Sequence, residues 1–213
     1  MTVAILLPVL GRPHRVQPVV DSIRAATAVP HEILFVCDPG DRATQDQVAL
    51  AGCRMISPGG GYARKINEAV RATTAPLLFL GADDLTFHDG WFEAASQRLN
   101  GAVHVVGVND LCSKRVQRGQ HATHFLMTRE YAELPTIDGG RGPLSEQYSH
   151  SFVDDELVAT ARARGTIAFA RDSIVEHQHP MNGTAPDDDT YRRGRARFAQ
   201  DRVLFRRRRS LWT

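Results

Sequence analysis

The sequence has little cysteine, and its three cysteines, Cys37, Cys53 and Cys112, lie far apart without a CxxC pair. This pattern predicts neither a disulfide framework nor a zinc site, and it fits a reducing compartment in which buried thiols act as small apolar side chains. No apolar run approaches the roughly 20 residues of a membrane-spanning helix. The start, MTVAILLPVLGRP, lacks the basic leader and cleavage site of a signal peptide. We therefore expect a cytoplasmic protein without a transmembrane segment.

Lysine is also scarce, because all but two of the 26 basic residues are arginine. The net charge is only +2, yet arginine crowds the segment from Arg192 to Arg209. The simplest interpretation of that segment is a solvated helix face with a compositional bias. The alternatives are contact with an anionic membrane surface or nucleic acid, and an oligomer contact.

Two common phosphate-binding signatures are absent, since neither GxxxxGK[ST] nor GxGxxG occurs. Three consecutive glycines instead precede a helical pattern that begins at Tyr62. A helix N-terminus offers backbone N–H groups and a positive dipole end to an anion, and Arg64 and Lys65 add charge in the first turn. The glycines alone are a weak signal, so this segment only suggests an anion site.

Short apolar segments alternate with helical patterns through the first 80 residues. Strands are expected at residues 3–9, 31–37, 54–57 and 76–80, with helices ending near residue 26 and spanning 41–51 and 62–73. This alternation predicts an α/β protein whose mostly parallel central sheet carries helices on both faces. In the second half we expect helices at 91–99, 153–164 and 187–209, strands at 103–108, 121–128 and 166–170, and a histidine-containing loop after the last strand. The irregular stretch 134–150 is a candidate substrate lid.

The stretch APLLFLGADDLT, residues 75–86, ends a short buried strand on two adjacent aspartates, Asp83 and Asp84. Ligands of open α/β sheets bind beyond the carboxyl ends of the strands, where these carboxylates are expected. Aspartate is equally common at helix caps and turns, so this stretch alone does not decide between a site and a turn.

Further acidic and histidine residues follow other expected strands or lie in loops. Hard carboxylate oxygens together with an imidazole suit Mg²⁺ or Mn²⁺, particularly when a substrate phosphate supplies more oxygens. Each group also has a plainer interpretation as a turn, a helix N-terminal charge or a solvated loop. The groups are Asp38, Asp83 with Asp84, Asp154 with Asp155 and Glu156, and His177 with His179.

Five segments, in order, resemble the family-2-type nucleotide-sugar glycosyltransferases of the GT-A fold. They read LPVLGRP, FVCDPGD, GGGYARKINEAVRATTAPLLFLGADDL, FVDDELVATARARG and VEHQHP, and they cover most of residues 1–180. The resemblance is greatest to small single-domain members found in bacteria and their phages. It implies a GT-A-like catalytic domain at residues 1–185, with a nucleotide-binding half at 1–100 and an acceptor half at 101–185, followed by an arginine-rich C-terminal helix at 186–213.

The resemblance implies a metal-dependent inverting glycosyltransferase. The donor would be a nucleoside-diphosphate sugar, a UDP- or GDP-sugar, and the acceptor would be a hydroxyl group of a carbohydrate, glycolipid or protein. The cofactor would be Mn²⁺ or Mg²⁺. The same resemblance implies donor-binding roles for Pro8, Leu10, Arg12, Asp38, Gly61, Arg64, Asp83 and Asp84, with Asp38 on the base, the turn at residues 10–12 beside the nucleoside, and Arg64 near the diphosphate.

The same comparison assigns metal and base positions. Asp83 stands in the Asp-x-Asp metal motif, and His177, or alternatively His179, is the late histidine that joins the metal. Asp154 takes the general-base position, with Asp155 as the fallback. Two departures stand out: Gly81 occupies the first aspartate of the metal motif, and Val153 replaces the glutamate of the usual Glu-Asp pair.

Two rival functions fit the sequence less well. A sugar-1-phosphate nucleotidyltransferase would carry a glycine-rich signature with a lysine after the first strand, where this chain reads LPVLGRPHR. A non-catalytic protein that keeps the fold to bind carbohydrate or nucleotide sugar is compatible with Gly81 and Val153. Slow hydrolysis of a nucleotide sugar would distinguish an enzyme from such a binding protein.

Overall fold

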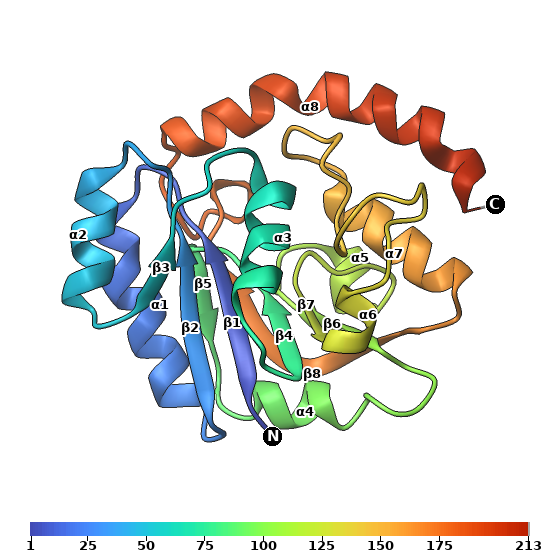
Figure 1. Cartoon of the computed structure of the whole chain (residues 1–213), viewed down its shortest axis with the longest axis horizontal. Coiled ribbons are helices and arrows are strands. Elements are labelled where there is room, and N and C mark those ends of the chain that lie inside the picture. Colours follow the sequence, from blue (N-terminus) through green and yellow to red (C-terminus); the bar gives the residue numbers. More distant parts are fainter. Residues whose placement is uncertain (213) are drawn as a thin grey trace.

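The computed structural model describes residues 1–212, and it is built around one eight-stranded sheet (Figure 1). The strand order is β3-β2-β1-β4-β7-β6-β8-β5. The strands are β1 (Val3–Pro8), β2 (His31–Val36), β3 (Arg54–Ile56), β4 (Leu77–Leu80), β5 (Leu85–Phe87), β6 (Val105–Asn109), β7 (Phe125–Thr128) and β8 (Ile167–His177). The sheet confirms the expected α/β class.

The first four strands in the order are all parallel and are joined by helical crossovers. These helices are α1 (Pro13–Ala26), α2 (Arg42–Leu50) and α3 (Tyr62–Ala72). Val3 pairs with both His31 and Leu77, so the carboxyl ends of β1, β2 and β4 reach the same edge of the sheet. Strands β1 and β4 are buried along their whole length, as expected for parallel strands covered on both faces.

The second half adds strands of mixed direction. Strand β7 is antiparallel to both β4 and β6, β6 is parallel to β8, and β5 is antiparallel to β8 at the sheet edge. Short helices connect these strands. The remaining helices are α4 (Trp91–Ser96), α5 (Lys114–Gln117), α6 (Arg129–Ala132), α7 (Val153–Ala163) and α8 (Asp189–Arg208), with 3₁₀ turns η1 (Pro180–Asn182) and η2 (Arg209–Leu211).

Two apolar cores lie on the two faces of the sheet. One packs α1, α2 and α4 against alternate residues of β1, β2 and β4, and the other packs α3, α6 and α7 against the intervening residues. Trp91 anchors the first core between Phe79 and Phe87, at ring-centroid distances of 4.9 and 5.1 Å, and its indole N–H donates to Thr27 Oγ1. Helices therefore cover both faces, as the sequence predicts.

Two strand predictions are wrong in extent. The strand expected at 166–170 continues to His177, so His177 ends β8 and does not lie in a loop. The charges of Arg171 and Asp172 hide this continuation in the sequence, and they sit beside a register shift between β8 and Val108/Asn109. The strand expected at 121–128 begins only at residue 125. Strand β5 was not predicted, because its three residues carry too short a pattern.

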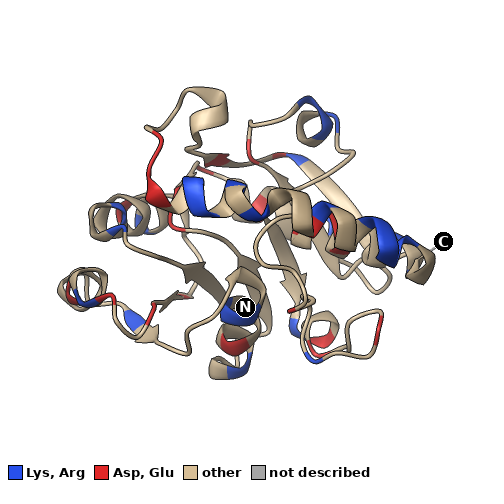
Figure 2. Ribbon diagram, turned by 90° about the horizontal axis from the view of Figure 1, so that it is seen from above, with Lys and Arg blue, Asp and Glu red and all other residues tan. Residues whose placement is uncertain are grey.

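Helix α8 confirms the expected C-terminal helix and lies across the edge where β1, β2 and β4 end (Figures 1 and 2). In its middle, buried Asp201 accepts backbone hydrogen bonds from Ser149, His150 and Ser151 at 2.8–2.9 Å. These bonds fasten the irregular segment 134–150 and the residues before α7 beneath the helix. Hydrogen bonds to a charged acceptor contribute about 1.5–3 kcal/mol each, so this carboxylate is a main tether of α8.

The far end of α8 is held by a second buried charge. Arg208 donates to both oxygens of Glu156 at 2.6 and 2.7 Å and to Asp138 at 2.8 Å. The hydrogen bond from Arg208 lowers the pKa of Asp138 to about 2. Other arginines of α8, among them Arg193 and Arg207, are exposed. Contact of this arginine-rich face with an anionic surface stays a prediction.

Candidate active site

Asp83 and Asp84 lie just beyond the end of β4 and are almost fully buried, with 6% and 5% of their surface exposed. The backbone N–H of Gly81 still bonds to Leu6, so the chain leaves the sheet only after this residue. A Cβ at Gly81 would lie 3.0–3.3 Å from the side chains of Leu7, Phe79 and Leu85. Apolar packing therefore leaves little room for the expected first carboxylate, which is a physical reason for glycine here.

A single guanidinium group contacts both aspartates. Nη1 of Arg12 lies 3.2 Å from Asp83 Oδ1 and 3.2 Å from Asp84 Oδ2. Arg12 also forms two hydrogen bonds with Asp188 at the start of α8, and its Cζ lies 3.9 Å from the ring centroid of Tyr191. Tyr191 in turn donates to Asp84 at 2.8 Å. The first turn of α8 thus takes part in this carboxylate cluster.

His177 approaches the cluster from the end of β8. Its Nε2 forms an ion pair with Asp84 Oδ1 at 3.3 Å, and its ring lies beside those of His124 and His179. Burial alone would lower the pKa of His177, but the charge of Asp84 raises it to about 10. Burial and the neighbouring charge of Asp84 raise the pKa of Asp83. His179 follows His177 by two residues, and its ring packs against the ring of Tyr191.

The donor set suits a hard divalent cation. It combines the two carboxylates with an imidazole nitrogen of His177, a set of ligands that Mg²⁺ and Mn²⁺ accept. Oδ2 of Asp83 is buried and has no hydrogen-bond partner among residues 1–212. A buried, unpaired carboxylate oxygen is costly unless a cation or a donor satisfies it. The ligand types therefore suit a metal, although the ligand atoms of Asp83, Asp84 and His177 do not all lie within 4.8 Å of one another and Arg12 neutralises part of the same charge.

A second acidic site lies at the start of α7. Asp154 Oδ2 is 3.2 Å from His121 Nε2, while Asp155 Oδ1 lies 3.7 Å from Arg115 Nη1. Burial opposes ionisation, but the hydrogen bond with His121 lowers the pKa of Asp154 and keeps the carboxylate ionised at neutral pH. Tyr62 is partly buried, and its hydroxyl donates to the carbonyl of Gly81 at 3.2 Å. Burial, together with the charges of Asp154 and Asp84, raises the pKa of Tyr62.

The residues predicted to hold the nucleoside gather at the ends of β1 and β2. Pro8 pairs with Val36 at the end of β1. Asp38 accepts a 2.9 Å hydrogen bond from Lys65, whose ammonium group also donates to Val9. The carbonyl of Leu10 accepts a hydrogen bond from Thr190 in α8. This cluster therefore connects the turn after β1, the end of β2 and the C-terminal helix.

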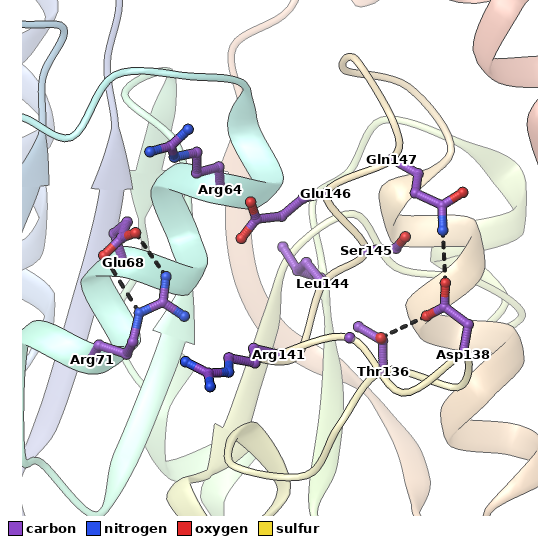
Figure 3. Close-up of a pocket in the computed structure, with 11 residues that line it drawn as sticks. Arg64, Glu68, Arg71, Thr136, Asp138, Arg141, Leu144, Ser145, Glu146 and Gln147 are labelled. Atoms are coloured by element: carbon purple, nitrogen blue, oxygen red, sulfur yellow. Dashed lines mark hydrogen bonds and ion pairs between the residues drawn. The ribbon is translucent and has the colours of Figure 1, made fainter.

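The helix that follows the three glycines borders an open groove of about 640 Å³ (Figure 3). Gly61 caps α3, and a Cβ at this position would lie 3.0 Å from the carbonyl oxygen of Ser149, so glycine permits this close approach. Arg64 of α3 lines the groove, and Arg141 and Glu146 of the irregular segment line it from the other side. Neither aspartate pair lines this groove, which lies between α3 and residues 136–147.

Four side chains of the site were not singled out from the sequence: His121, Lys65 in its pairing with Asp38, Asp188 and Tyr191. The last two lie in the helix expected at 187–209, just before the arginine-rich segment that was interpreted as a solvated face. The sequence DDDTY carries one usable signal, because Asp188 caps α8 through the backbone N–H of Tyr191. A cap predicts a helix start, but it does not predict a partner 176 residues away.

Comparison with known families identifies the enzyme class. The model of glycosyl transferase family 2 matches residues 4–159, well over half of the chain. The chain belongs to glycosyl transferase family 2. It is accordingly a glycosyltransferase that transfers a sugar from a nucleotide sugar, which confirms the enzyme class expected from the motifs. None of the curated proteins matches the sequence significantly.

Solved structures of other glycosyltransferases share the GT-A fold with this chain. Glucosyl-3-phosphoglycerate synthase from Mycobacterium tuberculosis, solved with Mn²⁺, UDP and glucosyl-3-phosphoglycerate, superposes with a TM-score of 0.61 at 15% identity, over 88% of this chain and 81% of that one. The mannosyltransferase PcManGT from Pyrobaculum calidifontis, solved with GDP-Man and Mn²⁺, gives a TM-score of 0.69 at 17% identity, over 94% of this chain and 61% of that one. At these identities the likeness establishes the fold. Within residues 1–212, no helix is long and apolar enough to cross a membrane.

Proposed function

We propose that this glycosyltransferase is metal-dependent and inverts the anomeric centre of its donor. The observation that carries the proposal is the buried pair Asp83 and Asp84 with His177 beside it, at the edge where β1, β2 and β4 end. Two carboxylates with this exposure need a cationic partner. In an enzyme that uses a nucleotide sugar, the cation held by these carboxylates would also contact the diphosphate of the donor.

The donor would be a UDP- or GDP-sugar. Asp38 and the turn at residues 10–12 would face the base and ribose, because they flank the ends of β1 and β2 at this edge. Arg64 and the N-terminus of α3 at Gly61 offer positive charge and backbone N–H groups to the diphosphate. The solved relatives support this donor class, since one was determined with UDP and the other with GDP-Man.

Mn²⁺ or Mg²⁺ would be held by Asp83, with Asp84 and His177 completing the protein ligands. When bound, such a cation neutralises the charge that develops on a leaving diphosphate. The fit rests on the unpartnered buried oxygen of Asp83 and on the mixed oxygen and imidazole set. Both similar structures were solved with Mn²⁺, which supports the same cofactor here.

Asp154 would act as the general base. Its carboxylate accepts the proton of the acceptor hydroxyl while that oxygen attacks the anomeric carbon from the face opposite the diphosphate. Such a direct displacement inverts the anomeric centre. His121 holds Asp154 by a hydrogen bond and stabilises its ionised form. Asp155 remains the second choice, because it forms an ion pair with Arg115.

The acceptor, a carbohydrate, glycolipid or protein, would enter beside the irregular segment. The groove between α3 and residues 136–147 is open, and both of its walls carry exposed polar side chains (Figure 3). Arg64 at the top of α3 links this groove to the glycine turn that would bind the diphosphate. The segment predicted as a lid therefore forms one wall of the proposed acceptor entrance.

Thermal unfolding with a panel of nucleotide sugars tests the proposal. A ligand at 100 times its Kd adds about 2.7 kcal/mol to the free energy of unfolding, which raises Tm by roughly 5–10 °C in a chain of this size. We expect such a shift for one UDP- or GDP-sugar with Mn²⁺ and a much smaller shift in EDTA. Equal shifts with and without the metal would contradict the metal-dependent function.

A further inference from the structure

Arg12 occupies an unusual position for an arginine. It lies at the residue before α1, is 3% exposed, and its guanidinium group contacts three carboxylates, those of Asp83, Asp84 and Asp188. The ring of Tyr191 packs against the same guanidinium group. Arginine is almost never buried unless it is paired. The pairing here is with the carboxylates that the proposed function assigns to the metal.

The contacts of Arg12 also fasten the first turn of α8. Asp188 accepts hydrogen bonds from Arg12 through both oxygens. The hydroxyl of Tyr191 lies 2.8 Å from both Asp84 and the carbonyl of Gln178, and Thr190 donates to Leu10. No other part of α8 reaches Asp83 or Asp84 through the contacts of residues 1–212. The start of the helix and the arginine therefore form one unit over the two aspartates.

This unit and a divalent cation compete for the negative charge of the same two carboxylates. Arg12 holds Asp83 Oδ1 and Asp84 Oδ2, so a metal on the remaining oxygens of these two carboxylates would lie within a few ångströms of the guanidinium group in a buried place. Two like charges this close in a buried place repel each other strongly, because little water screens them. We therefore expect Arg12 to leave at least one aspartate when a metal binds both.

We propose that Arg12 is a resident cation that holds Asp83 and Asp84 until a metal replaces it. In this account, metal binding releases the guanidinium group, and with it the Asp188 and Tyr191 contacts that hold the first turn of α8 over the site. Metal entry is thereby coupled to the opening of the C-terminal helix at its start. The inference rests on the proposed function, because the competing cation is the metal assigned there.

Mn²⁺ binding to the purified full chain tests the competition directly. Electron paramagnetic resonance of free Mn²⁺, with MnCl₂ titrated in the absence of nucleotide, gives the affinity without any activity assay. Arg12→Met keeps much of the side-chain length and removes the charge, and we expect it to bind Mn²⁺ at least about tenfold more tightly than the wild type. Arg193→Met removes an exposed arginine near the start of α8 and is the matched control.

Asp188→Asn provides a second variant that leaves the three proposed metal ligands and Arg12 in place. It weakens the hold on the guanidinium group, so we expect a smaller gain in Mn²⁺ affinity, of about threefold. Hydrogen exchange adds a readout of the helix: Mn²⁺ with UDP should accelerate exchange at residues 189–193 of the wild type. In Arg12→Met these amides should exchange rapidly before Mn²⁺ is added.

The outcomes separate the inference from the proposed function. Equal or weaker Mn²⁺ binding in Arg12→Met and Asp188→Asn, with clear binding by the wild type, overturns the role of Arg12 and leaves the metal-dependent function standing. Protection of residues 189–193 on addition of Mn²⁺ and UDP also overturns it. No Mn²⁺ binding by any variant, with or without UDP, overturns the metal-dependent function itself.

Discussion

Asp154→Asn is expected to lower kcat by about 10²- to 10⁴-fold, the range that a positioned general base contributes. Asparagine keeps the size of the side chain and one oxygen, but it cannot accept the proton of the acceptor hydroxyl. The nucleotide and the proposed metal ligands lie elsewhere, so the Kd of the donor should change little. Initial rates at saturating donor and acceptor, together with calorimetric titration of UDP or GDP with Mn²⁺, measure the two effects separately.

Asp155→Asn is the matched control for this experiment, because the residue is adjacent and contacts Arg115 at 3.7 Å. We expect its kcat to fall less than about tenfold. Arg115, the ion-pair partner of Asp155, is exposed, and losing an exposed ion pair has a small effect. The reverse pattern, with activity lost in Asp155→Asn and kept in Asp154→Asn, would assign the base to the second aspartate. Unchanged turnover in both variants would remove this site from the mechanism.

Asp83→Asn is expected to lower metal-supported transfer by about a hundredfold or more, since a group that stabilises developing charge contributes 10²- to 10³-fold or more. The neutral amide still accepts a hydrogen bond from Arg12, so the fold should persist, and circular dichroism checks this. The variant should also need a higher Mn²⁺ concentration for half-maximal rate. The rate as a function of Mn²⁺ concentration measures both changes.

Asp89→Asn, an exposed position six residues further along the chain, is the control for the loss of one negative charge. It should match the wild type in rate and in Mn²⁺ dependence. If Asp83→Asn shows the same Mn²⁺ dependence as this control, Asp83 does not bind the metal. In that case the pairing of Asp83 with Arg12 would be structural.

The first half of the fold could be predicted because its signals are local. Each strand there is a short apolar run. Helix α1 begins at Pro13, and α2 and α3 begin directly after Asp41 and Gly61. The second half carries weaker local signals. Strand β8 passes through Arg171 and Asp172 and is completed by pairing with β6 and β5, which no local pattern contains.

The carboxylates of the site could be predicted, but their partners could not. Asp83 and Asp84 end an obvious strand, and Asp154 begins an obvious helix. The groups that set their charge come from distant segments: Arg12 lies 71 residues before Asp83, and Tyr191 lies 107 residues after Asp84. An arginine-rich helix gives no sign in its composition that its first turn closes over an acidic site.

Proton nuclear magnetic resonance of donor hydrolysis tests the central claim most directly. The wild type is incubated with the UDP- or GDP-sugar that raises Tm, in Mn²⁺ and in EDTA, and the first free sugar is observed before it mutarotates. Metal-dependent, direct displacement predicts release only with Mn²⁺, and a first-formed anomer opposite in configuration to the donor. Equal release in EDTA, or a first-formed anomer with the configuration of the donor, would contradict the account.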